Sequence, residues 1–95
     1  MLMLDGKELS PFGNMYVVAE VNTSHFGKVN NAKSMIDSVA KSGCDTVKFQ
    51  SWSSSTLNSK AFYAENPIAR RMYDKLSLEK EELKYLSEYT QSKGI

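Results

Sequence analysis

Three polar side chains stand out because each interrupts or follows a short apolar run. Glu20 follows the apolar residues 16–19, and Lys48 and Gln50 lie within and directly after residues 47–49. An ammonium group can bind a phosphate or a carboxylate, and a charge-assisted bond of this kind contributes ~1.5–3 kcal/mol. A carboxylate can accept hydrogen bonds from hydroxyl groups or move a proton, and an amide can both donate and accept. These residue types suit a polar, anionic ligand, although Lys48 could simply pair with Glu20, and Gln50 could be a satisfied interior amide.

The segment between the two apolar runs has the pattern of a helix. Apolar residues recur there at helical spacing, at Ala32, Met35, Ile36, Val39 and Ala40. A strand–helix–strand unit forms part of a parallel sheet, whose ligands bind beyond the carboxyl ends of the strands. Side chains alternate between the faces of a strand, so Val47 and Phe49 under the helix would leave the three polar residues on the other face. We predict that they converge there, which a single β-bulge would undo.

Turn and cap signals predict the other elements. Asp5-Gly6 predicts a hairpin because both central residues of a type I′ turn need positive φ. Asn30 or Asn31 is expected to cap the helix, and Gly43 suits the position after its end. The predicted elements are, in chain order, a hairpin over residues 2–10, a strand over 15–21, a helix over 30–42, a strand over 46–50, a polar loop over 51–60, a helix beginning at Asn66-Pro67, and a helix that Ser77 caps and Lys93-Gly94 ends.

This order of elements divides the chain into two unequal parts. Residues 1–14 form a hairpin and turn, and residues 15–95 form two βα units. Two parallel strands do not make an independently stable sheet. Lys93-Gly94 ends a helix, and the β-branched Ile95 after it resembles the start of a third strand. We therefore expect the front part of a longer α/β protein.

Composition narrows the classes of partner and compartment. The 95 residues carry a formal charge of +1 with scattered charges, so neither nucleic acid nor an acidic tail is indicated. Cys44 is the single cysteine, which fits a reducing compartment. The N-terminus lacks the features of a signal peptide, and no apolar run approaches the ~20 residues of a membrane helix. A cytoplasmic protein without a membrane partner is the expectation.

Other residues offer weaker chemistry. His25 is the single histidine, so it cannot build a metal site alone; it is expected to order the first βα loop or to touch a substrate. The hydroxyl-rich residues 51–55 follow a strand end and could contact phosphate, although ordinary loop composition explains them equally well. Cys44, Tyr85 and Tyr89 are expected to be packing residues.

At this point the sequence resembles the start of the N-acetylneuraminate (sialic acid) synthase family. The likeness covers nearly all 95 residues and rests on a combination of motifs. The matching residues are Val18-Ala19-Glu20-Val21, Ser24-His25-Phe26-Gly27, Ala32, Met35-Ile36, Ala40, Gly43, Asp45, Val47-Lys48-Phe49-Gln50, Leu76-Ser77-Leu78, Leu83, Tyr89 and Lys93-Gly94-Ile95.

The resemblance implies a fold and a reaction. The fold is a (β/α)8 TIM barrel, of which this chain would supply the first βαβα part after a short hairpin. Family members condense phosphoenolpyruvate with the open-chain aldehyde of an N-acylated amino sugar and release phosphate. A divalent cation, Mn²⁺ or Mg²⁺, polarises the aldehyde and is held by histidines of later strands, outside this chain. The full-length protein would be a homodimer.

The resemblance also gives the candidate residues roles. Lys48 is similar to the lysine that anchors phosphoenolpyruvate, and Glu20 and Gln50 are similar to the groups that orient the sugar. Glu20 and Lys48 are therefore the catalytic candidates, and His25 joins Gln50 as a substrate-binding candidate. The first loop departs from the family: Asn22 stands where the family usually has Gly, and Ser24 where it has Asn.

Three alternatives remain open, and the departure in the first loop bears on the first of them. Related synthases that make pseudaminic or legionaminic acid vary in the same loop. Another phosphoenolpyruvate aldol-type barrel, such as a synthase of a keto-sugar acid phosphate, would need further basic residues beyond Ile95. A different class is a complete, non-catalytic α/β module whose helical faces dock on a partner, in which case Glu20 and Lys48 merely pair.

Overall fold

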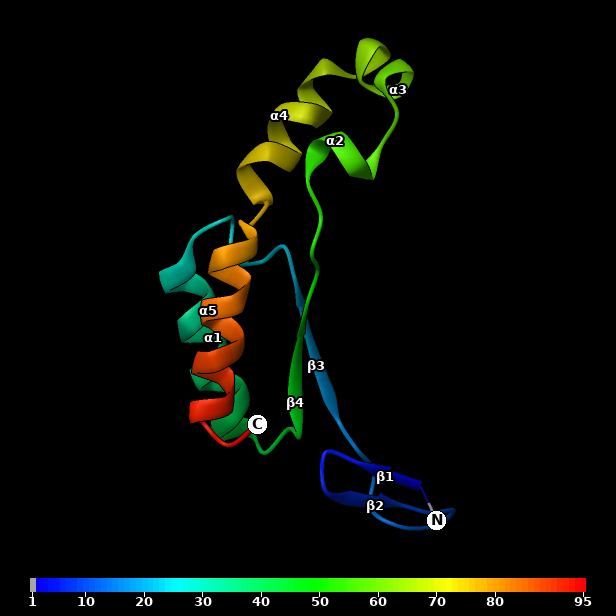
Figure 1. Ribbon diagram of the computed structural model, residues 1–95, viewed down its shortest axis with the longest axis vertical. Coiled ribbons are helices and arrows are strands. Elements are labelled where there is room, and N and C mark those ends of the chain that lie inside the picture. Colours follow the sequence, from blue (N-terminus) through cyan, green and yellow to red (C-terminus); the bar gives the residue numbers. More distant parts are fainter. Residues whose placement is uncertain (1) are drawn as a thin grey trace.

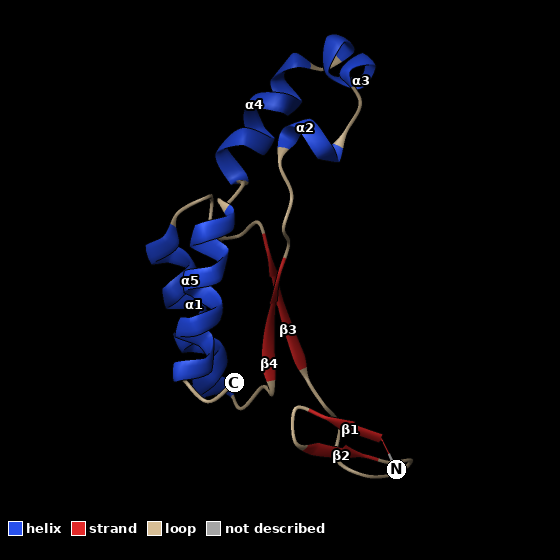
Figure 2. Ribbon diagram, viewed as in Figure 1, coloured by secondary structure: helices blue, strands red, loops and turns tan. Residues whose placement is uncertain are grey.

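The computed structural model describes residues 2–95 as an α/β chain with two small sheets and five helices (Figures 1 and 2). The elements are, in order, β1 (Leu2–Leu4), β2 (Lys7–Leu9), β3 (Val18–Asn22), α1 (Val29–Ser42), β4 (Thr46–Phe49), α2 (Ser54–Leu57), α3 (Lys60–Glu65), α4 (Pro67–Leu76) and α5 (Lys80–Ser92). None of the helices in this described part is long and apolar enough to cross a membrane.

The centre of the molecule has two layers, a strand pair and a helix pair. Strands β3 and β4 are parallel, and α1 and α5 lie side by side on one face of them (Figure 1). The core joins the two helices through Ile36 of α1 and Leu86 of α5, both fully buried. Val47 and Phe49 of β4 pack against this core. The predicted strand–helix–strand unit and the predicted helix-facing side of β4 are therefore confirmed.

The N-terminal hairpin lies at the amino end of the strand pair (Figure 1). Strands β1 and β2 are antiparallel, and the turn residues Asp5 and Gly6 have φ of 50° and 76°, as the type I′ prediction requires. Asp45, just before β4, accepts a hydrogen bond from Lys7 of the hairpin and another from the Val17 backbone N–H at 2.7 Å. One carboxylate thus joins the hairpin, the start of β3 and the start of β4.

The chain beyond β4 differs from the predicted polar loop over residues 51–60. Helix α2 forms within it because Ser53 and Thr56 make a capping box, which satisfies backbone N–H groups locally. Ser59 then caps α3 by accepting a hydrogen bond from the Phe62 N–H at 3.1 Å. Helices α2, α3 and α4 form an arm that extends past the carboxyl ends of β3 and β4 (Figure 2).

Two predicted caps are wrong, because Lys28 and Glu79 occupy the capping positions of α1 and α5. Helix α1 starts one residue earlier than predicted, and Asn31 lies inside its first turn, where its amide donates to the His25 carbonyl. Asn30 also lies within that turn. Ser77 follows α4, whereas α5 begins after Glu79, whose capping box with Glu82 closes its first turn.

Candidate functional site

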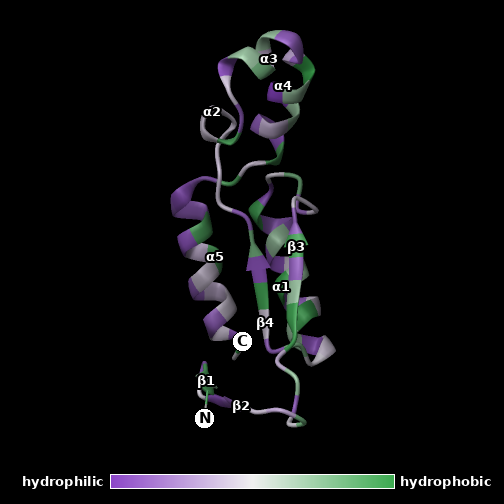
Figure 3. Ribbon diagram, turned by 90° about the vertical axis from the view of Figure 1, so that its right-hand side faces the viewer, coloured by the Kyte–Doolittle hydropathy of each residue, from purple (hydrophilic) through white to green (hydrophobic). Residues whose placement is uncertain are grey.

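Glu20 and Lys48 are direct neighbours across the parallel strand pair. The register pairs Glu20 with Lys48, and both side chains lie on the face that α1 and α5 leave uncovered. A β-bulge does occur, but it falls after this pair, between Glu20 and Asn22. Figure 3 shows the resulting hydrophilic bands at the same height on β3 and β4. The polar residues therefore stay together despite the bulge.

The ion pair between these residues is loose and open to solvent. Lys48 Nζ lies 3.8 Å from Glu20 Oε2, and their side chains are 60% and 47% exposed. Exposed pairs of this kind contribute only about 0–1 kcal/mol, because water screens the charges. Lys48 is thus not a buried ammonium that depends on Glu20 for solvation. Its charge remains available to an anion.

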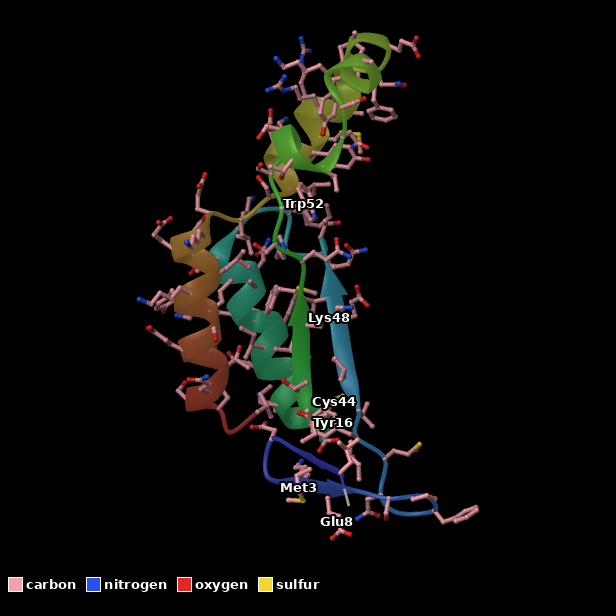
Figure 4. The ribbon with its side chains drawn as sticks, turned by 45° about the vertical axis from the view of Figure 1, so that its right-hand side comes forward. Met3, Glu8, Tyr16, Cys44, Lys48 and Trp52 are labelled. Atoms are coloured by element: carbon pink, nitrogen blue, oxygen red, sulfur yellow. The ribbon has the colours of Figure 1, made fainter. Side chains whose placement is uncertain are left out.

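Gln50 completes the cluster just beyond the end of β4. Its Nε2 donates to Glu20 Oε1 at 3.3 Å, while its Oε1 accepts from the indole Nε1 of Trp52 at 3.1 Å. Figure 4 shows Lys48 on β4 and Trp52 beyond the carboxyl end of that strand. Sequence reasoning missed Trp52, although positions 48, 50 and 52 continue the same period of two.

The structure places His25 apart from these three residues. His25 is 2% exposed, and its ring centroid lies 6.0 Å from that of Phe49, on the side of β4 that packs toward the core. Its Nδ1 accepts a hydrogen bond from the Gly27 N–H at 2.9 Å, and burial lowers its pKa below the usual value of 6.5. This geometry orders the first βα loop. The geometry does not favour the predicted contact of His25 with a substrate, and that contact stays an untested prediction.

The hydroxyl groups of residues 51–55 are largely committed to the arm. Ser54 is buried and donates to Asp74 of α4, and its carbonyl accepts from Tyr63 at 2.6 Å. The hydroxyl of Ser53 belongs to the capping box of α2. These contacts favour the structural alternative for Ser53 and Ser54.

A metal centre does not fit the residues present. Between residues 2 and 95, no group of three His, Cys, Asp or Glu side chains lies close enough to hold an ion. Cys44 is a free, half-buried thiol that accepts a hydrogen bond from Ser42 at 3.3 Å. The chemistry of the described cluster is therefore that of one ammonium, one carboxylate and one amide.

Comparison with known proteins supplies the family context. The sequence model of the NeuB family matches residues 35–95. An N,N′-diacetyllegionaminic acid synthase of Legionella pneumophila is 34% identical over an alignment of 89 residues; the match covers 84% of this chain and 25% of that protein. An uncharacterised protein of Methanocaldococcus jannaschii is 30% identical over 80 residues, which cover 84% of this chain and 22% of that one. The chain thus spans about a quarter of the length of these relatives.

Proposed function

Because the chain belongs to the NeuB family of sialic-acid-synthase-like proteins, we propose that it is the N-terminal part of a phosphoenolpyruvate-dependent synthase. The full-length enzyme would condense phosphoenolpyruvate with an N-acylated amino sugar to give a nonulosonic acid and phosphate. In this proposal β3 and β4 are the first two strands of a (β/α)8 barrel, whose interior is the face that carries Glu20 and Lys48. The half-buried free thiol of Cys44 supports a reducing, cytoplasmic setting.

One observation carries the proposal for the site. Glu20, Lys48 and Gln50 form a single hydrogen-bonded and ion-paired cluster at the carboxyl end of the parallel strands. This is the end at which barrel enzymes place their active sites. The Lys48 ammonium would bind the carboxylate or phosphate of phosphoenolpyruvate. Glu20 and Gln50 would hold hydroxyl and N-acyl groups of the sugar, so that its aldehyde carbon meets C3 of phosphoenolpyruvate.

The sugar is proposed from the relative with a named product. The Legionella protein is a diacetyllegionaminic acid synthase, which favours a substrate with two N-acetyl groups over one with a single N-acetyl group. We place the divalent cation on residues outside this chain, because the described residues do not gather its ligands.

Substitution of Lys48 tests this function in the full-length protein. We expect Lys48→Ala to raise the KM for phosphoenolpyruvate about ten- to a hundredfold, the equivalent of one charge-assisted bond. The KM for the sugar should change little. Phosphate release at varied phosphoenolpyruvate, with mono- and di-N-acetylated amino sugars as acceptors, measures both constants.

Lys41→Ala is the matched control, because Lys41 lies in the last turn of α1, on the helical side of the strand pair. It should keep wild-type constants. Wild-type kinetics for Lys48→Ala would refute the assignment of Lys48, and a wild-type protein that condenses neither sugar would refute the proposed reaction.

A further inference from the structure

Trp52 ends a chain of polar contacts that starts at Lys48. The indole Nε1 donates to Gln50 Oε1 at 3.1 Å, and Gln50 Nε2 donates to Glu20 Oε1 at 3.3 Å. The other oxygen of Glu20 lies 3.8 Å from Lys48 Nζ. Trp52 itself touches neither charged residue in these contacts. Its effect on the cluster must therefore pass through the Gln50 amide.

The indole N–H determines the orientation of the Gln50 side-chain amide. A glutamine amide has one accepting end and one donating end, and rotation by 180° exchanges them. The indole N–H can only donate, and an ionised carboxylate can only accept. Only one orientation satisfies both Trp52 and Glu20. The rotated amide would set N–H against N–H and oxygen against oxygen.

The indole is itself held from outside the cluster. Its ring meets the ring of Tyr73 edge-on, with the centroids 5.6 Å apart and an interplanar angle of 83°. Tyr73 lies on α4 and also packs near Tyr63, whose buried hydroxyl donates to the Ser54 carbonyl. The arm therefore fixes Trp52 without using any group of the candidate site.

We propose that Trp52 is a positioning residue that fixes the Gln50 amide with its NH2 group toward Glu20 and the ligand. This inference rests on the proposed function. With Oε1 engaged by Trp52, Gln50 offers the sugar an N–H donor. Glu20 offers an acceptor. The sugar group that meets Gln50 must then accept a hydrogen bond, as an N-acyl carbonyl or hydroxyl oxygen does, and the group at Glu20 must donate one.

Trp52→Phe in the full-length protein removes the N–H and keeps an aromatic edge for Tyr73. We expect the KM for the amino sugar to rise about two- to tenfold, the worth of one neutral hydrogen bond, while the KM for phosphoenolpyruvate stays unchanged. If Trp52 had a purely structural role, the substitution would instead change the KM for the amino sugar and the KM for phosphoenolpyruvate together. Ile68→Ala, which removes an exposed side chain from α4 of the same arm, is the control and should alter neither.

A double-mutant cycle tests whether Trp52 acts through Gln50. Gln50→Leu should raise the sugar KM by a smaller factor in the Trp52→Phe background than in the wild type, because the amide there is no longer fixed. Equal factors in both backgrounds, or a wild-type sugar KM for Trp52→Phe, would overturn the inference.

A readout without substrates separates this inference from the proposed function. The indole N–H of Trp52, followed by NMR, should exchange with solvent faster in Gln50→Leu than in the wild type. An unchanged exchange rate would show that the bond to Gln50 is absent and would refute the positioning role. A faster rate in a protein that condenses neither sugar would support the bond and refute the reaction alone.

Discussion

The left-handed backbone conformation of one residue, Asn22, shapes the end of β3 beside the candidate site. Asn22 has φ of 49° and occupies the bulge that follows Glu20. Asparagine adopts this left-handed conformation more readily than most residues, and glycine adopts it most readily. A positive φ is uncommon for a residue other than glycine, and here it coincides with the bulge just after Glu20. Asn22 thus lets β3 continue past Glu20 while Glu20 stays paired with Lys48.

At the same scale, burial of His25 predicts a pH-dependent stability. Burial lowers the pKa of His25 below 6.5, against weaker opposing effects of the Asn22 carbonyl and the charge of Glu82. The unfolded chain therefore binds a proton more readily than the folded one. Stability should be greatest above pH 6.5 and should fall as the pH drops through 6.5 toward the lowered folded pKa.

Denaturation of the full-length protein with urea at pH 7.5 and at pH 5.5 measures this loss. His25→Gln removes the titrating group, so the difference between the two pH values should shrink in that variant. Equal differences in the wild type and in His25→Gln would contradict the prediction.

Between elements, the first βα loop approaches the end of α4 closely at Gly27. Gly27 has φ of 72°, and a Cβ there would lie 2.1 Å from the Lys75 carbonyl oxygen. We expect Gly27→Ala to lower the free energy of unfolding by about 2–5 kcal/mol, since the left-handed backbone and the overpacking both contribute. Chemical denaturation of the full-length protein measures the loss.

Gly43→Ala is the matched control. Gly43 ends α1 with φ of 85°, but a Cβ there would meet nothing within 4 Å. Gly43→Ala should lower the free energy of unfolding only by the cost of the left-handed backbone, about 1–2 kcal/mol. Equal losses for the two variants would show that the loop moves aside and that the contact with Lys75 does not constrain it.

The elements also show what the sequence could and could not predict. Helix α1 and the two strands follow from periodicity, because each presents one apolar face to a common core. In the arm, the start of α4 at Pro67 also confirms the helix predicted at Asn66-Pro67. Helices α2 and α3 could not be predicted, because α2 is only four residues long and Ser54 is fixed by Asp74, 20 positions away. Likewise, the alternation of side chains along a strand predicts that Gln50 lies beside Glu20. The contact of Trp52 with Tyr73 could not be predicted in this way, because it depends on the tertiary position of α4.

At the scale of the whole molecule, the strand pair is covered on one face only. Val18 is 47% exposed beside Glu20, although valine usually lies inside. In the proposed barrel this face would line the interior. The Lys48–Glu20 pair, weak in water, would then interact more strongly, because a lower dielectric strengthens both its own attraction and the attraction of Lys48 to an anionic substrate.

The N-terminal hairpin is tied to this centre through Asp45, which accepts a hydrogen bond from Lys7. Its hydrogen bonds from Lys7 and from the Val17 N–H lower its pKa, so the carboxylate is ionised at neutral pH. Asp45→Asn removes the charge that holds Lys7. We expect the hairpin to detach more often while α1, α5 and their core stay folded, because Ile36 and Leu86 lie outside these contacts.

Limited proteolysis of the full-length protein with chymotrypsin tests this anchoring. Phe12 lies fully exposed in the turn after the hairpin, and a detached hairpin gives the protease more of the extended chain that cleavage requires. Mass spectrometry should show loss of residues 1–12 several-fold faster in Asp45→Asn than in the wild type. Glu8→Gln, which removes an exposed charge from the same hairpin, should cleave at the wild-type rate. Equal rates for Asp45→Asn and Glu8→Gln would mean that this carboxylate does not hold the hairpin against the strands.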